Sequence, residues 1–413
     1  MLDIKFIREN ADMVRQALAN RNDGTSVDEV LSLDALRRQK LSEQEDLNRA
    51  KKEVAKLGLG SASGDGRELR ERAKAIDENV REIDSKLAEL LLQIPNIPHP
   101  SVPIGKNEEE NVIERYWGTP KEFTFSAKPH WELGKELEII DFDRGVKLSG
   151  TRFYILKGLG ARLERAVISL MLDIHTNENH YQEIYPPWMV KREVMTASGN
   201  LPKFAENLYH DDVDDMWFVP TAEVPLTSLH AGEILSASDL PIRYAAYTSC
   251  FRREKMSAGK DNRGIKRGHQ FDKVELYKFT RPEDSEKEHS MMLSDIESIC
   301  QRLDLAYRVK LLCTGDISFA SQKTYDIEVW APGCREWLEV SSCSNCGDFQ
   351  ARRAGIRFRT SQEAKAEYVH TLNGSGLALP RIMIALLENN QQPDGSILLP
   401  QELHKYMHTS IIK

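Results

Sequence analysis

FRREKMSAGKDNRGIKRGHQFDKVELYKF, running from Phe251 to Phe279, carries the most distinctive local pattern of this sequence. Between Arg252 and Lys273 it holds eight Lys or Arg residues against three Asp or Glu, although the whole chain has a formal net charge of −8. Apolar runs bracket it, IRYAAYTSCF before it and VELYKF near its end, so it predicts two strands joined by a basic loop. A solvated charged loop is the simpler interpretation. A local excess of cations between two strands is better suited to an anion such as a nucleotide polyphosphate.

The composition is that of a globular protein with more than one domain. The chain has 413 residues, of which 40% are hydrophobic and 29% charged. The N-terminus, MLDIKFIREN, is charged at once and no apolar run reaches membrane length, so we expect no signal peptide and no membrane span. Six cysteines in a chain of this length do not make a disulfide framework, and a cytoplasmic location is expected. With a pI near 5.9, any nucleic-acid binding must come from a local patch.

The first hundred residues have their own periodicity. Two segments repeat at spacings of three and four, which predicts two helices of about 30 residues with a heptad seam. The stretch GLGSASGDG, Gly58 to Gly66, predicts a turn, so the helices should form an antiparallel hairpin on the order of 40–45 Å long. Because Lys40 and Glu43 occupy seam positions, we expect looser packing there. The seam positions are Leu33, Leu36, Lys40, Glu43, Leu47, Ala50, Val54 and Leu57, then Leu69, Ala73, Ile76, Val80, Ile83, Leu87 and Leu90.

A proline-rich stretch, QIPNIPHPSVPIGKNEEEN, follows the hairpin and predicts a linker, because proline cannot continue a helix. We therefore expect a helical domain at 1–100, a linker at 101–120 and a mixed α and β domain at 121–413. The start Gly58-Leu59-Gly60 is not a dinucleotide-binding loop, because no strand precedes it. Taken alone, the hairpin is more typical of dimerisation or scaffolding. Its first helix has seven charges of each sign from Asp28 to Lys56, which is weak evidence for RNA binding.

Two further segments of the second domain have a defined pattern. GARLERAVISLMLDIHTNENHYQEIYPPWMV predicts a helix followed by a short strand, and its apolar face predicts core: Leu163, Ala166, Val167, Leu170 and Ile174. TLNGSGLALPRIMIALLENNQ predicts a tight turn at residues 373–376 and then an apolar helix with Pro380 in its first turn. Arg381, at the start of that helix, should have an anionic or aromatic partner.

In this order, the three segments resemble the three signatures of class II aminoacyl-tRNA synthetases. Within that class the chain resembles the seryl-tRNA synthetases over nearly its full length. The match rests on the N-terminal arm and on TAEVPL at Thr221–Leu226, GHQFDKVE at Gly268–Glu275 and EVSSCSN at Glu339–Asn345. The resemblance implies an α+β fold, in which an antiparallel sheet of six or seven strands is flanked by helices and preceded by the helical coiled-coil arm. It also implies a homodimer built partly through the first signature.

The resemblance further implies a serine–tRNA ligase. L-Serine and ATP would form seryl-adenylate and pyrophosphate, and the seryl group would pass to the terminal adenosine of tRNA-Ser, or of tRNA-Sec where one exists. ATP would be a substrate and Mg²⁺ a cofactor. The arm would clamp the long variable arm of a tRNA held by the other subunit, by shape and backbone contacts.

Residues of the second and third signatures match the family's ATP site. By this resemblance Arg252 and Arg381 are the catalytic candidates: Arg252 would hold the α-phosphate and the serine carboxylate, and Arg381 would lie near the γ-phosphate. A guanidinium can stabilise the charge that develops during in-line displacement. Glu254 would read the adenine amino group, Phe271 would lie under the ring, and Arg263 in the loop would be a second γ-phosphate contact.

The same resemblance implies a magnesium site at Glu339 and Ser342, whose hard oxygens suit Mg²⁺ beside substrate phosphates. The remaining ATP-site candidates are Arg253, Val340 and Ser341. No general base is assigned, because the serine carboxylate is already a nucleophile. The CxxC at Cys343–Cys346 lacks a second pair at zinc spacing, so we expect no zinc there.

Serine would be recognised by its hydroxyl and its ammonium group. Glu275 matches the residue that accepts the hydroxyl's proton, helped by Ser375. Such a pocket rejects analogues without the hydroxyl by roughly 10⁴-fold. Thr221 and Glu223 would hold the α-ammonium group. Two neighbours complete the candidates for the serine site: Ala222 and Asn373.

The sequence departs from the family pattern at Lys255-Met256, where a small pair is usual, and at Pro380, where a small residue is usual. Neither change removes a ligand. Three alternatives are weaker. A non-catalytic paralogue would lack one of Arg252, Glu254, Glu275 or Arg381, and all are present. An amino acid–carrier-protein ligase on the same core would lack the arm. A pure coiled-coil scaffold leaves the second domain unexplained.

Overall fold

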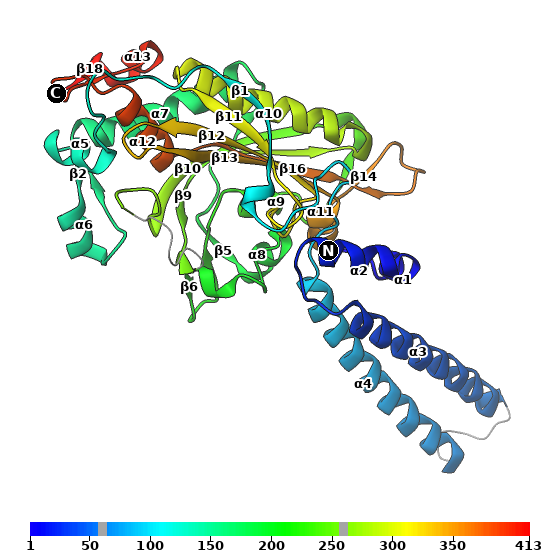
Figure 1. Ribbon diagram of the computed structural model, residues 1–413. Coiled ribbons are helices and arrows are strands. Elements are labelled where there is room, and N and C mark those ends of the chain that lie inside the picture. The colour runs from blue at the N-terminus through cyan, green and yellow to red at the C-terminus, as the bar shows by residue number, and fades with distance from the viewer. Residues whose placement is uncertain (57–63, 256–262) are drawn as a thin grey trace. The chain divides into compact units, whose positions relative to one another are not determined.

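The computed structural model describes residues 1–56, 64–255 and 263–413 (Figure 1). The chain divides into two compact units, Met1–Ile97 and Pro98–Lys413. The first strand of the second unit, β1 (Val112–Trp117), pairs with β11 (Tyr307–Leu311). Part of the stretch predicted as a linker is therefore an edge strand of the sheet, and the second unit begins before residue 121. Within the described residues, no helix is both long and apolar enough to cross a membrane.

The first unit contains two short helices, α1 (Ile4–Glu9) and α2 (Ala11–Asn20), and two long ones, α3 (Val27–Lys56) and α4 (Gly64–Gln93). The long helices have 30 residues each and lie antiparallel (Figure 1), which confirms the predicted hairpin. Hydrogen bonds join Gln44 to Asp77 and Arg37 to Asp84 across the hairpin. Both pairs belong to one antiparallel register, because the two residues on each helix are equally far apart.

The heptad seam is confirmed most clearly on α4, where its buried positions are Ala73, Val80, Ile83 and Leu87. On α3, Leu47 is buried, but Leu36 is 39% exposed, so its assignment to the seam was wrong. Lys40 and Glu43 are half-buried and form an ion pair of 2.8 Å with each other, so they give the seam little apolar area. Of the predicted turn, residues 57–63 lie outside the described residues, and residues 64–66 already belong to α4.

The second unit is built on an eight-stranded sheet with the order β1-β11-β12-β13-β16-β10-β9-β4. Neighbouring strands are antiparallel except for β4, which lies parallel to β9. The bounds of the strands not yet given are β12 (Lys323–Ala331), β13 (Glu336–Gly347), β16 (His370–Ala378), β10 (Gln270–Thr280), β9 (Ile242–Phe251) and β4 (Gln182–Glu183). The α+β fold is confirmed, and the strand number is corrected from six or seven to eight. Both edges are hard to predict, since β4 has two residues and β1 lies in the proline-rich stretch.

Three helices pack on one face of this sheet: α7 (Leu159–Asn177), α10 (Ser285–Arg302) and α12 (Leu379–Asn389). They share one core with Val274 and Leu276 of β10. All five apolar residues predicted for the face of α7 are buried, which confirms that prediction. Because side chains alternate along a strand, Lys273 and Glu275 point to the opposite face, away from these helices.

Residues 373–376 are not the predicted turn, since they lie inside the central strand β16. A Cβ on Gly374 would lie 2.8 Å from Ile296 Cδ1 of α10, and one on Gly376 would lie 3.2 Å from His175 Nε2 of α7. The glycines therefore allow helices to approach the sheet closely. From the sequence alone, a glycine that serves this purpose in a strand looks the same as a glycine in a turn. Helix α12 follows as predicted, with Pro380 in its first turn.

Shorter elements surround the sheet and form four small sheets, β15-β14-β8, β17-β18, β2-β3 and β5-β7-β6. The bounds of these elements are α5 (His130–Glu136), β2 (Ile140–Asp141), α6 (Phe142–Ser149), β3 (Ile155–Leu156), β5 (Met189–Lys191), α8 (Arg192–Ser198), β6 (His210–Asp211), β7 (Met216–Phe218), α9 (Glu223–Thr227), β8 (Ile234–Ser236), α11 (Phe349–Ala354), β14 (Arg357–Arg359), β15 (Glu367–Tyr368), β17 (Ile397–Leu398), α13 (His404–Met407) and β18 (Ile411–Ile412).

Candidate active site

A cavity of about 390 Å³ lies over the strands β10, β13 and β16. The antiparallel sheet brings to it residues that are far apart in the sequence. Twelve of the sixteen predicted site residues line it: Thr221, Glu223, Arg252, Glu254, Phe271, Glu275, Glu339, Val340, Ser342, Asn373, Ser375 and Arg381.

The other four predicted residues do not line the cavity. The Arg253 Nε donates to the Leu208 carbonyl at 2.8 Å. Ala222 is fully buried, and the Ser341 hydroxyl donates to the Ser375 carbonyl at 2.6 Å. The guanidinium of Arg263 lies over the ring of Trp131, 4.8 Å from its centroid. For Ser341 the physical reason is alternation, because it lies between the cavity-lining Val340 and Ser342 on β13 and successive side chains of a strand point in opposite directions. Arg253 is held away from the cavity by its hydrogen bond to Leu208 and by the Tyr209 ring, which its guanidinium covers.

Several residues that the sequence pattern does not single out also line the cavity, above all Lys273, which is almost fully buried. Its ammonium group donates to Thr221 Oγ1 at 2.7 Å and pairs with Glu275. The Thr221 hydroxyl in turn donates to Glu275 Oε2 at 3.0 Å. A detectable signal existed, because Lys273 and Glu275 are two residues apart on one strand and so share a face. The other residues missed are Lys266, Arg267, Gly268, Ser318, Ser344, Ala378 and Pro380.

Glu223 is a second carboxylate of the cavity and is half-buried. Its Oε1 accepts hydrogen bonds from Gln350 Nε2 at 2.7 Å and from Asn373 Nδ2 at 3.1 Å. Burial and then the nearby charge of Glu275 raise the pKa of Glu223 to about 7. A carboxyl group in this environment gains most from a ligand that brings a positive charge.

Arg252 and Phe271 form the central part of the cavity wall. The Arg252 guanidinium lies 5.1 Å from the centroid of the Phe271 ring, and its Nε donates to the Pro220 carbonyl at 3.2 Å. Glu254 nearby has a left-handed backbone with a φ of 50° and lies 3.4 Å from Arg267. A residue other than glycine adopts this left-handed conformation at a cost in free energy, and residues strained in this way cluster at ligand and active sites.

Arg381, at the start of α12, has the anionic partner that the sequence predicts. It lies 3.2 Å from the carboxylate of Glu339 and donates to the Glu339 carbonyl at 2.6 Å. Burial alone would raise the pKa of Glu339, but the cations Arg381, Arg252 and Arg267 outweigh it and the pKa is lowered. The cavity therefore has a positive wall that holds an ionised carboxylate.

A group of oxygen donors adjoins this wall. Asp326, Glu339 and Ser342 line a neighbouring cavity of about 460 Å³. In the described part of the chain, Asp326 Oδ1 is buried without a hydrogen-bond partner. Burial and the charge of Glu339 raise the pKa of Asp326. An unsatisfied carboxylate oxygen beside a second carboxylate and a hydroxyl fits a hard divalent cation such as Mg²⁺.

An antiparallel sheet with two arginines and paired carboxylates over its open face is the arrangement of class II aminoacyl-tRNA synthetases. The tRNA synthetase class II core domain (G, H, P, S and T) matches residues 205–390. The seryl-tRNA synthetase N-terminal domain matches residues 1–98, and the chain is 60% identical to a serine–tRNA ligase of Dehalococcoides mccartyi, with 100% of both chains covered. The chain belongs to the seryl-tRNA synthetase family.

Solved structures agree with this assignment. The seryl-tRNA synthetase of Pyrococcus horikoshii complexed with ATP is 38% identical and superposes with a TM-score of 0.94 over 100% of this chain and 99% of that chain. The cytoplasmic serine–tRNA ligase of Naegleria fowleri in complex with AMP is 31% identical, with a TM-score of 0.89 over 100% and 99%.

Proposed function

We propose that the chain is a serine–tRNA ligase, which forms seryl-adenylate from L-serine and ATP and transfers the seryl group to the terminal adenosine of tRNA-Ser. Where an organism has tRNA-Sec, that tRNA is a second acceptor. The observation that carries the proposal is one cavity that joins the carboxylates Glu223 and Glu275 to the arginines Arg252 and Arg381. The names of the full-length relatives and the ATP complex of the Pyrococcus protein support it.

The cavity suits an attack of the serine carboxylate on the α-phosphorus of ATP. Arg252 holds the carboxylate and the α-phosphate together, and the adenine lies against Phe271 with Glu254 at its amino group. Arg381 is placed for the γ-phosphate. Catalysis here is positioning and charge stabilisation, without a protein base. Mg²⁺ fits Glu339 and Ser342, with Asp326 as a further oxygen donor, and when bound it neutralises phosphate charge.

The serine subsite uses the two carboxylates Glu223 and Glu275 differently. Glu223 pairs with the α-ammonium group, which supplies the positive charge that its environment lacks. Glu275 accepts a hydrogen bond from the serine hydroxyl. The negative charge of Glu275 is compensated by its ion pair with Lys273. When an analogue without the hydroxyl binds, a buried oxygen of Glu275 receives no hydrogen bond from it. The free-energy cost of this unpaired oxygen gives the selectivity for serine.

The pKa of Glu223, about 7, predicts that serine binds less tightly in acid. Because its pKa is raised, Glu223 is protonated below pH 7, and a neutral carboxyl cannot pair with the ammonium group. The KM for serine should therefore rise as the pH falls below 7, approaching about tenfold per pH unit. Pyrophosphate exchange measured from pH 5.5 to 8.5 checks this. Glu223→Gln is the control, since it should have a high serine KM that is independent of pH. A flat profile for the unmodified protein would contradict the assignment.

The hairpin arm is the proposed tRNA contact. Its charges are segregated: residues 49–74 at the far end contain eight Lys or Arg against four Asp or Glu, whereas residues 27–46 contain three against six. The antiparallel register brings the basic parts of α3 and α4 side by side. A basic, extended surface suits an RNA backbone recognised by shape.

We also propose a homodimer in which the tRNA bound to one subunit contacts the arm of the other. All six residues of the edge strand β1 are exposed, and several are apolar, so this edge is available for a second copy. All six cysteines are free thiols, which agrees with a reducing cytoplasmic location.

The direct test is exchange of labelled pyrophosphate into ATP. Exchange should depend on serine and should not occur with glycine, alanine or threonine, with cysteine as a further control. Charging of tRNA-Ser then tests the second step. A folded protein that exchanges with no amino acid would contradict the ligase proposal and favour the non-catalytic alternative.

A further inference from the structure

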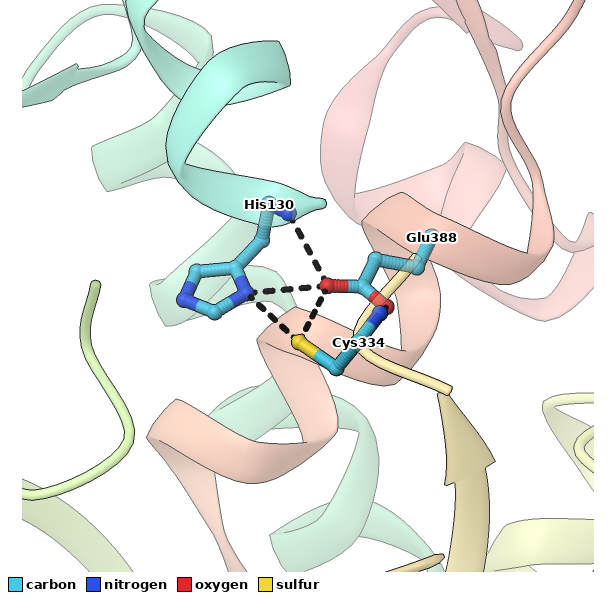
Figure 2. Close-up of side chains that lie close together, drawn as sticks. All are labelled: His130, Cys334 and Glu388. Atoms are coloured by element: carbon cyan, nitrogen blue, oxygen red, sulfur yellow. Dashed lines mark hydrogen bonds and ion pairs between the residues drawn. The ribbon is translucent and has the colours of Figure 1, made fainter. Parts of the chain in front are cut away.

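Outside the ATP and serine subsites, three side chains from distant parts of the chain meet in a second cluster, His130, Cys334 and Glu388 (Figure 2). His130 and Glu388 are completely buried, and Cys334 is partly exposed. Their nitrogen, sulfur and oxygen atoms lie within 4.8 Å of one another. His130 begins α5, Cys334 lies between β12 and β13, and Glu388 lies in the last turn of α12. We call these three residues the His130 cluster.

Glu388 is the acceptor at the centre of the His130 cluster. Its Oε1 accepts from the backbone N and the Nδ1 of His130, both at 2.9 Å, and from the Cys334 thiol at 3.1 Å. Its Oε2 accepts from the backbone N–H groups of Gly333 and Cys334, both at 2.9 Å. Burial alone would raise the pKa of Glu388, but the hydrogen bonds from His130 and Cys334 outweigh it and the pKa is lowered. The carboxylate is thus ionised and fully hydrogen-bonded.

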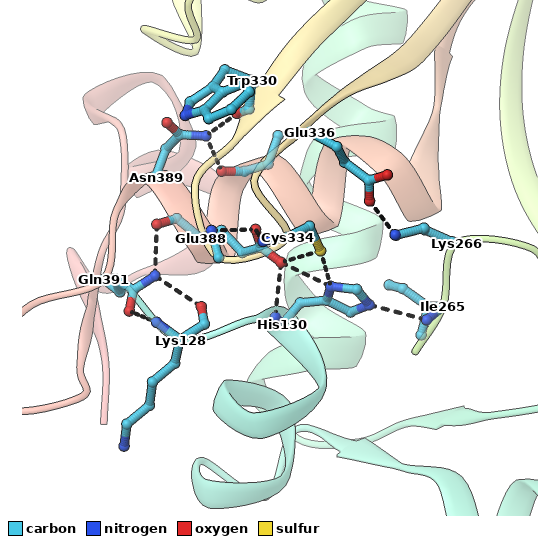
Figure 3. A network of polar contacts seen from close by, with 12 residues as sticks. Lys128, His130, Ile265, Lys266, Trp330, Cys334, Glu336, Glu388, Asn389 and Gln391 are labelled. Carbon is cyan, nitrogen blue, oxygen red and sulfur yellow. Dashed lines mark hydrogen bonds and ion pairs between the residues drawn. The ribbon is translucent and has the colours of Figure 1, made fainter. Parts of the chain in front are cut away.

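The second ring nitrogen of His130 holds the returning limb of the basic loop (Figure 3). The backbone N–H of Ile265 lies 3.2 Å from His130 Nε2. A backbone N–H can only donate, so Nε2 is the acceptor and the ring proton is on Nδ1, where it meets Glu388. The imidazole therefore bridges the Glu388 carboxylate of α12 and the backbone N–H of Ile265 in the loop.

Further contacts bring the same limb close to the cluster. Gly264 has a φ of 71°, and a Cβ there would collide with His130 Nε2, so only glycine lets the loop close on the ring. The guanidinium of Arg263 lies over Trp131, the next residue after His130. At the other end of the limb, Lys266 forms an ion pair with Glu336.

The limb held in this way continues directly into the cavity wall. Lys266 and Arg267 follow Ile265 and line the cavity, where Arg267 lies 3.4 Å from Glu254. Glu388 lies in the last turn of α12, and Arg381, the proposed γ-phosphate contact, lies in the first turn of the same helix. The His130 cluster thus links the limb that carries Lys266 and Arg267 to the helix that carries Arg381.

We propose that His130 and Glu388 are positioning residues for ATP binding: by accepting the Ile265 N–H, His130 holds Lys266 and Arg267 at the cavity, in register with the Arg381 helix. This goes beyond the ATP contacts proposed above and rests on that function. Neither residue lines the ATP cavity, so both act through the loop backbone.

The hydrogen bonds favour this role over a metal site. A cation between the three side chains would have to displace the proton on His130 Nδ1 and the thiol proton of Cys334, both of which already bind Glu388. It would also compete with three backbone N–H groups that point at the carboxylate. Donors surround Glu388 on both oxygens, which is the environment of a structural carboxylate.

Two substitutions of His130 separate its two contacts. His130→Asn keeps a donor where Nδ1 lies and loses the acceptor for Ile265. His130→Gln places its amide oxygen where Nε2 lies, so it keeps that acceptor and loses the donor to Glu388. Each variant breaks one buried hydrogen bond, but the one lost in His130→Gln goes to an ionised carboxylate, so this variant should lose at least as much thermal stability as His130→Asn.

ATP affinity is expected to differ between the two variants. His130→Asn should raise the Kd and the KM for ATP by about tenfold, and His130→Gln by no more than about threefold. The KM for serine should stay within about twofold of the unmodified protein in both. Calorimetric titration with ATP and pyrophosphate exchange give these values, and melting temperatures verify that both variants fold.

Three results would overturn the proposal. One is an equal change in ATP affinity in both variants, which would mean that only the packing of the ring matters. Another is no change in either variant. The third is about one zinc ion per chain in the purified protein by elemental analysis, which would make the cluster a metal site. The calorimetry does not need the reaction, so a protein that binds ATP but exchanges with no amino acid would refute the ligase function and still test the His130 cluster.

Discussion

Arg252→Ala should lower serine-dependent pyrophosphate exchange on the order of 10³-fold while the protein remains folded. Arg252 lines the cavity, with its guanidinium 5.1 Å from the ring of Phe271. In the proposed mechanism it holds the serine carboxylate and the α-phosphate together, and the charge on that phosphate grows during the displacement. Its loss removes a stabilisation that alanine cannot replace.

The neighbouring arginine is a matched control for this experiment. Arg253 has the same side chain, but its Nε donates to the Leu208 carbonyl and its guanidinium lies over Tyr209, outside the cavity. Arg253→Ala should cost some stability and change the exchange rate by less than about fivefold at saturating substrates. Comparable losses in both variants, measured by exchange at saturating serine and ATP, would contradict the assignment of Arg252.

The parts of the fold that the sequence predicts well depend on short-range periodicity. The α4 seam from Ala73 to Leu87 and the buried face of α7 follow from repeats that one helix imposes on its own residues. The two strands of the quoted segment, β9 and β10, follow from the apolar runs beside the basic loop. Leu36 is an exception, because its spacing fits the heptad but its side chain is 39% exposed.

Other features depend on what lies opposite a residue in the folded chain, which periodicity does not contain. Gly374 and Gly376 look like a turn in the sequence, but they serve the approach of α10 and α7 to a strand. The contact between His130 and Ile265 spans 135 positions and requires the fold itself. For the site, a family resemblance names the residues expected to touch ligands, and twelve of the sixteen line the cavity, but it does not reveal a residue such as Glu388 that is proposed to act through another group.

Shortening the arm should separate the two steps of the proposed reaction. The register of the hairpin, given by the Gln44–Asp77 and Arg37–Asp84 pairs, defines a clean truncation. Removing residues 44–77 and joining the ends with a short glycine-containing turn keeps the base of the hairpin and the Arg37–Asp84 contact. It also removes the basic segment 49–74.

The truncated protein should exchange pyrophosphate within about twofold of the full chain, because the cavity of the second unit is unchanged. Its kcat/KM for charging tRNA-Ser should fall on the order of 10²-fold, and the charging rate should depend less steeply on salt, since each lost phosphate contact lowers that slope by about one. Aminoacylation assays at several salt concentrations, with exchange as the internal control, measure both quantities. Unchanged charging would mean that the arm does not bind the tRNA, and a loss of exchange together with charging would mean that the arm supports the catalytic unit itself. The prediction requires that only the tRNA-dependent step responds, because the basic charge of the arm and the chemistry of the cavity belong to separate compact units.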